Sequence, residues 1–169
     1  MAPSSDNIPA KALMIAASRG SAEAVRILLD KGADSNEKDP ATGATALMIA
    51  VTRSHTEVAR ILLEKGANAN CVDRDTGFTA LMLASAKGCT EIVRVLLEKG
   101  AEINARAKDD NTALILATAG GHVGTVKLLL EKGAHCHVRN KPGWTALMYA
   151  TSKGHAEIAQ LLRNAGANE

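Results

Sequence analysis

A string of six residues recurs along this chain of 169 residues at an almost constant interval. The sequence reads Thr-Ala-Leu-Met-Ile-Ala from Thr45, and close copies begin at Thr79, Thr112 and Thr145. The intervals are 34, 33 and 33 residues, and an earlier copy begins at Lys11. A fixed period of this length indicates a repeat protein, in which each unit is a small element that stacks on its neighbours.

A second string recurs in step with the first and ends in Lys-Gly-Ala. Its copies begin at Ile27, Ile61, Val95 and Leu128, and a degraded copy begins at Leu161. The two strings together divide the chain into a lead-in, residues 1–10, and one repeat domain, residues 11–169. We expect five units in this domain: 11–44, 45–78, 79–111, 112–144 and 145–169.

Each unit has the pattern of two short helices. In the second unit, Leu47, Ala50 and Val51 follow the i, i+3, i+4 spacing of an apolar helical stripe. Gly88 separates the two helices of the third unit and Gly100 follows the second, which are places where helices end in a left-handed residue. The polar stretch after each second helix is rich in turn residues and too short for a third helix.

These repeated strings resemble the ankyrin repeat family. The shared features are the Thr-x-Leu opening, the Gly-His turns at 121–122 and 154–155, the Leu-Leu-Glu-Lys-Gly-Ala run and the asparagines at 36, 70 and 104. The resemblance covers residues 11–169 and implies an all-α fold. This fold is an α-solenoid of five stacked helix-turn-helix repeats, with β-hairpin-like loops that project at a right angle and form a concave face. The family's usual Pro-Leu-His opening is here Ala-Leu-Met or Ala-Leu-Ile, so the helix-starting proline is missing.

The composition argues against several functional classes. The net charge is +2 and aromatic residues make up 2% of the chain, so neither phosphate attraction nor base stacking favours a nucleic-acid partner. The first ten residues have no basic start and no apolar run, and no apolar run approaches the roughly 20 residues of a membrane span. Cys71, Cys89 and Cys136 lack CxxC spacing, and we expect free thiols in a reducing, cytoplasmic compartment.

The sequence contains no recognisable catalytic motif. A P-loop, a dinucleotide-binding fingerprint and a His-Glu-x-x-His helix are all missing. His55, His122 and His155 occupy equivalent positions in three units, which favours a structural role. Residues 135–137 read His-Cys-His, but adjacent side chains diverge, so we expect a turn there rather than a metal site. We therefore expect no enzyme, no cofactor and no metal ion.

Positions that vary between units are the candidates for recognition, because the recurring positions build the stack. The variable positions are the loop residue before each opening threonine, the exposed side of the first helix and the acidic loop tips. The candidate partner-binding residues are Trp144, Tyr149, Phe78, Asn111, Arg19, Arg53, Lys87, Lys153, Asp75 and Asp109. We expect the aromatic residues to lie on the surface and the four cations to line the concave face. Two alternatives remain: Trp144 and Phe78 pack on the neighbouring loop, and the cations serve only the helix dipole.

The leading hypothesis is a non-enzymatic protein–protein interaction module. It would be a monomer that binds a partner protein or peptide through the concave face and the loop tips, with no nucleic acid and no membrane. One alternative is an ankyrin domain of a larger multidomain protein, and another is an artificial binding scaffold. Irregular residues such as Ser54, Cys71 and Cys89 argue against a designed sequence.

Three further expectations concern individual units. The ends should be polar caps, because Lys11 replaces the opening threonine and Gln160, Arg163 and Asn164 enter the last helix. The fourth unit should be the softest, because Gly120 and Gly124 stand where the third unit has Lys87 and Glu91. The stretch from Leu96 to Asn104 resembles the ankyrin-type substrate of the animal asparaginyl hydroxylase. The alternative is that Asn104 only fixes its turn through hydrogen bonds.

Overall fold

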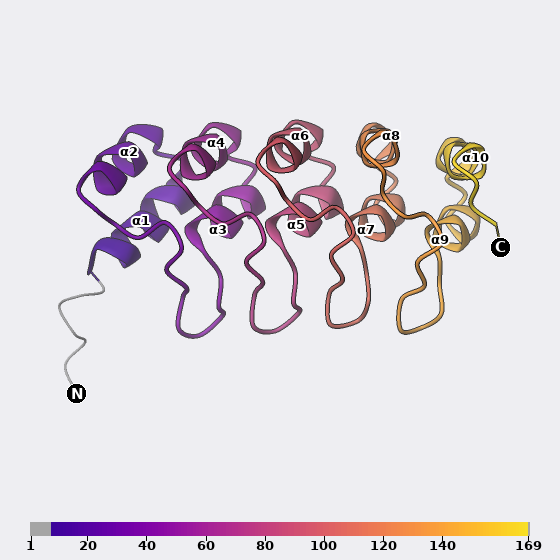
Figure 1. The fold of residues 1–169 in the computed structure, drawn as a ribbon, viewed down its shortest axis with the longest axis horizontal. Helices are drawn as coiled ribbons and strands as arrows, with labels where there is room; N and C mark the ends of the chain where they lie inside the picture. The colour runs from indigo at the N-terminus through magenta and orange to yellow at the C-terminus, as the bar shows by residue number, and fades with distance from the viewer. Residues whose placement is uncertain (1–7, 169) are drawn as a thin grey trace.

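The computed structural model describes residues 8–168, and this part of the chain contains ten helices and no strand. The helices are α1 (Ile8–Arg19), α2 (Ala22–Asp30), α3 (Ala46–Thr52), α4 (Thr56–Glu64), α5 (Ala80–Ala86), α6 (Thr90–Glu98), α7 (Ala113–Ala119), α8 (Val123–Glu131), α9 (Ala146–Ser152) and α10 (Ala156–Asn164). Figure 1 shows odd-numbered helices in one row and even-numbered helices in a second row above it. The predicted all-α solenoid of stacked helix pairs is therefore confirmed.

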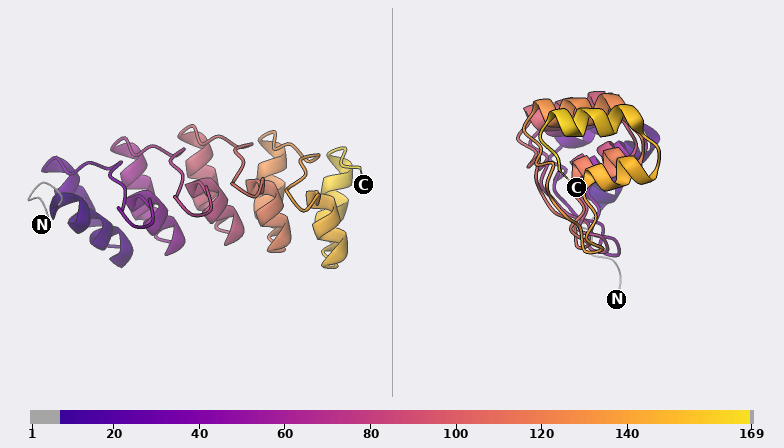
Figure 2. Two further views of the ribbon diagram at one scale, coloured as in Figure 1. Left: turned by 90° about the horizontal axis from the view of Figure 1, so that it is seen from below. Right: turned by 90° about the vertical axis from the view of Figure 1, so that its right-hand side faces the viewer.

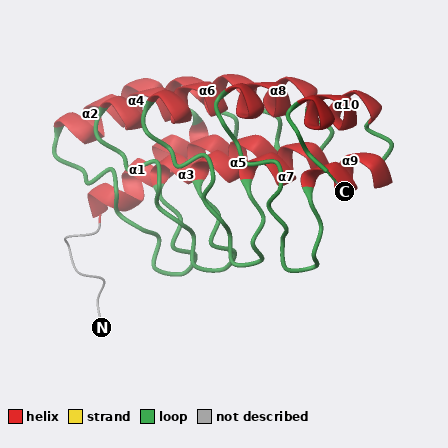
Figure 3. Ribbon diagram, turned by 45° about the vertical axis from the view of Figure 1, so that its right-hand side comes forward, coloured by secondary structure: helices red, strands yellow, loops and turns green. Residues whose placement is uncertain are grey.

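Four loops project from the helical rows on one side (Figure 3). Two of them are closed by isolated antiparallel bridges, Lys38 with Thr45 and Val72 with Thr79, so they are hairpin-like without forming strands. Helix α1 begins three residues before the expected start of the first unit. The remaining lead-in, residues 1–7, and Glu169 of the expected fifth unit lie outside the described residues.

The opening threonines explain why the first helices start without proline. Thr79 has extended backbone angles, φ −88° and ψ 166°, and its hydroxyl oxygen accepts a hydrogen bond from the Met82 amide at 3.3 Å. Thr45, Thr112 and Thr145 cap α3, α7 and α9 in the same way. An N-cap of this kind stabilises a helix by about 1 kcal/mol, which accounts for the recurrence of threonine at this position.

The histidines that open the second helices pack on the glycine turns of the preceding units. The Nε2 atom of His122 lies 3.0 Å from the Ala86 carbonyl oxygen, and a Cβ atom added to Gly88 would overlap the imidazole ring. The turn after α3 is the exception. There Ser54 has a left-handed backbone angle, φ 60°, and Cys89 replaces the histidine, with 3.3 Å between Ser54 Oγ and Cys89 Sγ. Where the turn residue has a side chain, as Ser54 does, the residue that packs on it from the next unit is the smaller Cys89 instead of histidine.

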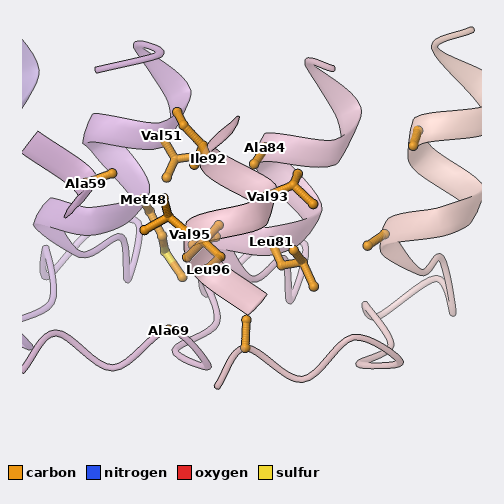
Figure 4. Close-up of a cluster of buried hydrophobic side chains, with 14 of the residues drawn as sticks. Met48, Val51, Ala59, Ala69, Leu81, Ala84, Ile92, Val93, Val95 and Leu96 are labelled. Atoms are coloured by element: carbon orange, nitrogen blue, oxygen red, sulfur yellow. The ribbon is translucent and has the colours of Figure 1, made fainter. Parts of the chain in front are cut away.

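The core consists of small and aliphatic side chains shared between neighbouring helix pairs. Figure 4 shows Val51, Leu81 and Ile92 among them, and all three side chains are almost fully buried. Ala50 and Ala84 are 0% exposed, which lets the first helices approach closely. Each fully buried aliphatic side chain contributes about 1.5–3 kcal/mol, so the stack is held mainly by apolar contact between units.

The two ends of the stack differ, which corrects one expectation. Ile27 of α2 is 46% exposed, whereas Ile61 at the equivalent position of α4 is 1% exposed. The first unit therefore exposes an apolar residue of the kind that the second unit buries, instead of forming a fully polar cap. At the other end Arg163 and Asn164 are exposed, as expected for a polar cap.

Polar ladders connect successive units along the stack. The Asn36 side chain accepts the Asn68 amide at 2.7 Å and donates to the Gly66 carbonyl at 3.2 Å. Asn70 makes the same two bonds to the next unit, and so does Asn104, at 2.8 Å to the His135 amide and 3.5 Å to the Gly133 carbonyl. The ladder has no fourth member, because histidine occupies position 137. Hydroxylation of Asn104 stays a prediction.

An ionic ladder on the even-numbered helices ends at the fourth unit. Arg26 pairs with Glu57 at 2.9 Å and Arg60 pairs with Glu91 at 3.2 Å, each across a unit boundary. At the next step Gly124 stands where the other units have glutamate, and within residues 8–168 Arg94 forms an ion pair only in its own helix, with Glu91 at 3.7 Å. Glycine in place of glutamate at position 124 therefore removes the ion pair between units, and it also replaces a residue of good helix propensity.

The two glycines expected to soften the fourth unit are not equivalent. Gly120 is the C-cap of α7 and not an interior helix residue, and a Cβ atom there would lie 2.5 Å from His122 Nε2. Gly124 lies inside α8, and the nearest atom to an added Cβ is Thr90 Oγ1 at 3.5 Å. Gly120 is therefore not a destabilising helix residue, because the lack of a side chain there makes room for His122. The expectation that the fourth unit is the softest rests on Gly124 alone.

Candidate partner-binding surface

The odd-numbered helices and the projecting loops meet at an angle, which the end-on view of Figure 2 shows. We call the surface inside this angle the inner surface. It contains a shallow pocket of about 330 Å³ that spans the first three units. The pocket is lined by Ser18, Ala44, Met48, Ile49, Thr52, Arg53, Asp73 and Leu83. Its lining combines aliphatic side chains with polar ones.

Three of the four predicted cations have no partner within residues 8–168. Arg19, Arg53 and Lys87 are exposed, and none of them forms an ion pair or a side-chain hydrogen bond in this part of the chain. Lys153 differs, because its ammonium group donates to the Ala119 carbonyl oxygen at the end of α7, at 2.9 Å. The expectation of four equivalent cations is corrected at Lys153, which caps the neighbouring helix.

Two of the three aromatic residues, Tyr149 and Phe78, are less exposed than expected. Trp144 is 38% exposed and Tyr149 is half-buried against the core. Their ring centroids lie 5.0 Å apart at an interplanar angle of 48°, a favourable tilted arrangement. Phe78, at the position equivalent to Trp144, is also half-buried. The expectation that all three aromatic rings lie on the surface therefore holds best for Trp144.

Asn140 organises the aromatic pair and is not among the site residues predicted from the sequence. Its side chain is 5% exposed, and Oδ1 accepts the Trp144 amide at 2.9 Å. Its Nδ2 atom donates to Asn111 Oδ1 at 2.9 Å and to the Tyr149 hydroxyl at 3.0 Å. Three predicted site residues are thus brought together by one buried amide. The sequence does mark Asn140 as unusual, because the first two units have aspartate at the equivalent position.

Those two aspartates close their own loops. Hydrogen bonds from the Thr42 amide and hydroxyl lower the pKa of Asp39 below its usual range. For Asp73, partial burial raises the pKa, but hydrogen bonds from the hydroxyl and amide of Thr76 outweigh it and the pKa is lowered overall. Both carboxylates are therefore ionised at neutral pH and hydrogen-bonded within their own loops. This holds for Asp73 although it also lines the pocket.

The two predicted acids at the loop tips also differ from each other. Asp75 and Asp109 are both exposed. The carboxylate of Asp109 accepts bonds from the Asn111 amide, at 3.1 Å, and from its side chain, at 2.7 Å. The carboxylate of Asp75 has no hydrogen bond or ion pair within the described part of the chain. Asp75 is thus the more available of the two.

The His-Cys-His triplet does not converge on one point. Cys136 is 7% exposed and its thiol lies 3.6 Å from the Ala165 carbonyl oxygen, whereas His135 and His137 are exposed. From residue 8 to residue 168, no three His, Cys, Asp or Glu side chains come close enough together to hold a metal ion. All three cysteines are free thiols. Over the same range, no helix is both long enough and apolar enough to cross a membrane.

Comparison with known proteins agrees with the geometry of the stack. A family model described as ankyrin repeats (3 copies) matches residues 13–107 and 104–169. A search of curated proteins finds no match. Proteins of the matched family are generally protein–protein interaction modules and typically are not enzymes. The matched residues span nearly the whole chain, and the chain therefore belongs to the ankyrin repeat family.

Proposed function

We propose that this chain is a non-enzymatic interaction module that binds a protein or peptide through its inner surface and loop tips. The observation that carries the proposal is the aromatic cluster of the fourth loop. Asn140 fixes the backbone of Trp144, Tyr149 supports its ring, and 38% of Trp144 still faces solvent. An aromatic side chain held in this way loses little freedom on binding, which is the property of an interface anchor.

Further charged candidates lie in the units before this anchor. Arg19, Arg53 and Lys87 offer positive charge to the first three units, and Asp75 offers negative charge at a loop tip. A surface of this kind favours a partner of mixed or negative charge. The proposal extends to a monomeric state and to a cytoplasmic location, where three free thiols stay reduced.

Affinity capture from an extract of the host cell tests the proposal. The immobilised chain should retain a protein, and Trp144→Ala should weaken its binding by about 2 kcal/mol. Lys132→Ala, an exposed change beside the outer row of helices, is the matched control and should have no effect. A partner that binds both variants equally well would contradict the proposed surface, and so would the absence of any retained protein.

A further inference from the structure

We propose that the inner surface of the first three units binds an extended peptide segment that carries an acidic residue at every third position, beside an aliphatic residue. This inference rests on the proposed function and names the chemistry of the partner. It starts from two parallel rows of side chains. Each of α1, α3 and α5 contributes one aliphatic residue, and the cation follows four positions later, at or just after the end of the helix.

The first row is aliphatic and the second is cationic. Ile49 and Arg53 line the pocket together, and Leu83 of the next unit lines it as well. Lys87 lies one turn beyond Leu83, just as Arg53 lies one turn beyond Ile49. Because residues at i and i+4 share a helix face, each unit presents an apolar contact next to a positive charge.

The cations are available to a partner because nothing within residues 8–168 neutralises them. Arg53 and Lys87 are the C-caps of α3 and α5, yet neither side chain is hydrogen-bonded to a carbonyl group, unlike that of Lys153. The acid in the pocket, Asp73, is ionised but accepts four hydrogen bonds from its own loop, at 2.5–3.1 Å, and forms no ion pair with Arg53 within residues 8–168. Arg19, Arg53 and Lys87 thus form a row of cations without ion-pair partners within residues 8–168, and Arg53 brings this row into the pocket beside Ile49 and Leu83.

The spacing of the units selects an extended ligand. Helices α1, α3 and α5 pack directly on one another, and packed helices lie about 8–10 Å apart. A polyproline II segment repeats its face every three residues, or about 9 Å, so one acid per turn would meet one cation per unit. A β-strand repeats its face about every 7 Å and does not keep this register.

The row of available cations ends after the third unit. Gly120 supplies no cation, and Lys153 donates to the Ala119 carbonyl oxygen. Trp144 and Tyr149 take over the inner surface there. The acidic segment would therefore occupy the part of the chain from α1 to α5.

The test uses the full chain and a fluorescent peptide of three consecutive Glu-Leu-Pro triplets. A second peptide has the same composition but places its three glutamates side by side, which keeps the charge and loses the register. Fluorescence anisotropy should show tighter binding of the first peptide. Arg53→Gln with Lys87→Gln should weaken binding about tenfold, since each exposed charge pair contributes up to about 1 kcal/mol.

Lys99→Gln with Lys132→Gln is the control, because it removes the same charge beside the even-numbered helices. Its effect should stay below about twofold. Equal binding of the two peptides, equal loss in the two variants, or tighter binding of a helical peptide with glutamate at every seventh position would overturn the inference. Failure of every peptide to bind would overturn it as well. The proposed function would fail separately, on the capture experiment with Trp144→Ala.

Discussion

The first three units and the last two units share one backbone plan but use their inner surface differently. In the first two units Asp39 and Asp73 close the hairpin loops, and Arg19, Arg53 and Lys87 of the first three units have no ion-pair partner within residues 8–168. In the last two, Asn140 takes the place of the aspartate and holds an aromatic pair, and Lys153 is bonded to a helix end. The comparison teaches that departures from the repeat, more than the repeat itself, indicate what each unit does.

The largest expected effect is a difference in the free energy of unfolding between a change in the Asn140 loop and a change in the first region. Asn140→Ala removes three hydrogen bonds from a buried site and should lower the free energy of unfolding by about 3 kcal/mol. Asn36→Ala, at an exposed ladder position of the first region, should cost less than about 1 kcal/mol. Chemical unfolding followed by the fluorescence of Trp144, the single tryptophan, measures the first cost directly. Equal costs would mean that Asn140 is not the centre of its loop.

A second effect compares the turn pair Ser54–Cys89 with the glycine–histidine pairs. Cys89→His alone should destabilise the chain by about 1–2 kcal/mol, because histidine rings elsewhere occupy the space that the Ser54 side chain fills. Combined with Ser54→Gly, the same change should be tolerated. A double-mutant cycle in urea should therefore give a coupling energy of at least about 1 kcal/mol. Additive effects would show that the two substitutions are independent.

A smaller effect concerns the break in the ionic ladder. Gly124→Glu should raise stability by about 1 kcal/mol, because it restores helix propensity, an acid in the first turn of α8 and a partner for Arg94. The melting temperature should rise by about 2–4 °C in circular dichroism. Gly124→Gln, which lacks the charge, should give only part of this gain. No change in either variant would mean that packing between units alone sets the stability of the fourth unit.

The smallest effect is a difference in pH response between the loops. A carboxylate with a lowered pKa in the folded state stabilises the fold above its unfolded pKa of about 4, and the contribution is lost as pH falls through the lower folded value. The amide resonances of Thr42 and Thr76 should therefore titrate below pH about 4, while that of Trp144, bonded to Asn140, should not. Nuclear magnetic resonance spectra recorded down to pH about 2 test this difference. A shift of Trp144 in step with Thr42 would indicate general acid unfolding.

The helical stack could be predicted from the sequence because its determinants recur. Threonine caps at 45, 79, 112 and 145 act locally, within three residues, and a local rule is visible in the sequence. The roles of Lys153, Gly120 and Asn140 could not be predicted in the same way. Each depends on contacts with other elements, such as Ala119, His122 and Tyr149, whose direction only the packed chain shows. The exposure of Ile27 likewise depends on having no unit stacked on that face within the described residues.

The central claim is that partners bind the inner surface, and hydrogen exchange on a complex with a captured partner tests it most directly. Binding slows exchange where it restricts opening of the backbone. We predict slower exchange at the loop tips, residues 39–44, 73–78, 107–111 and 140–144, and in α1, α3, α5, α7 and α9, with the even-numbered helices unchanged. Protection confined to the even-numbered helices α2, α4, α6, α8 and α10 would contradict the account.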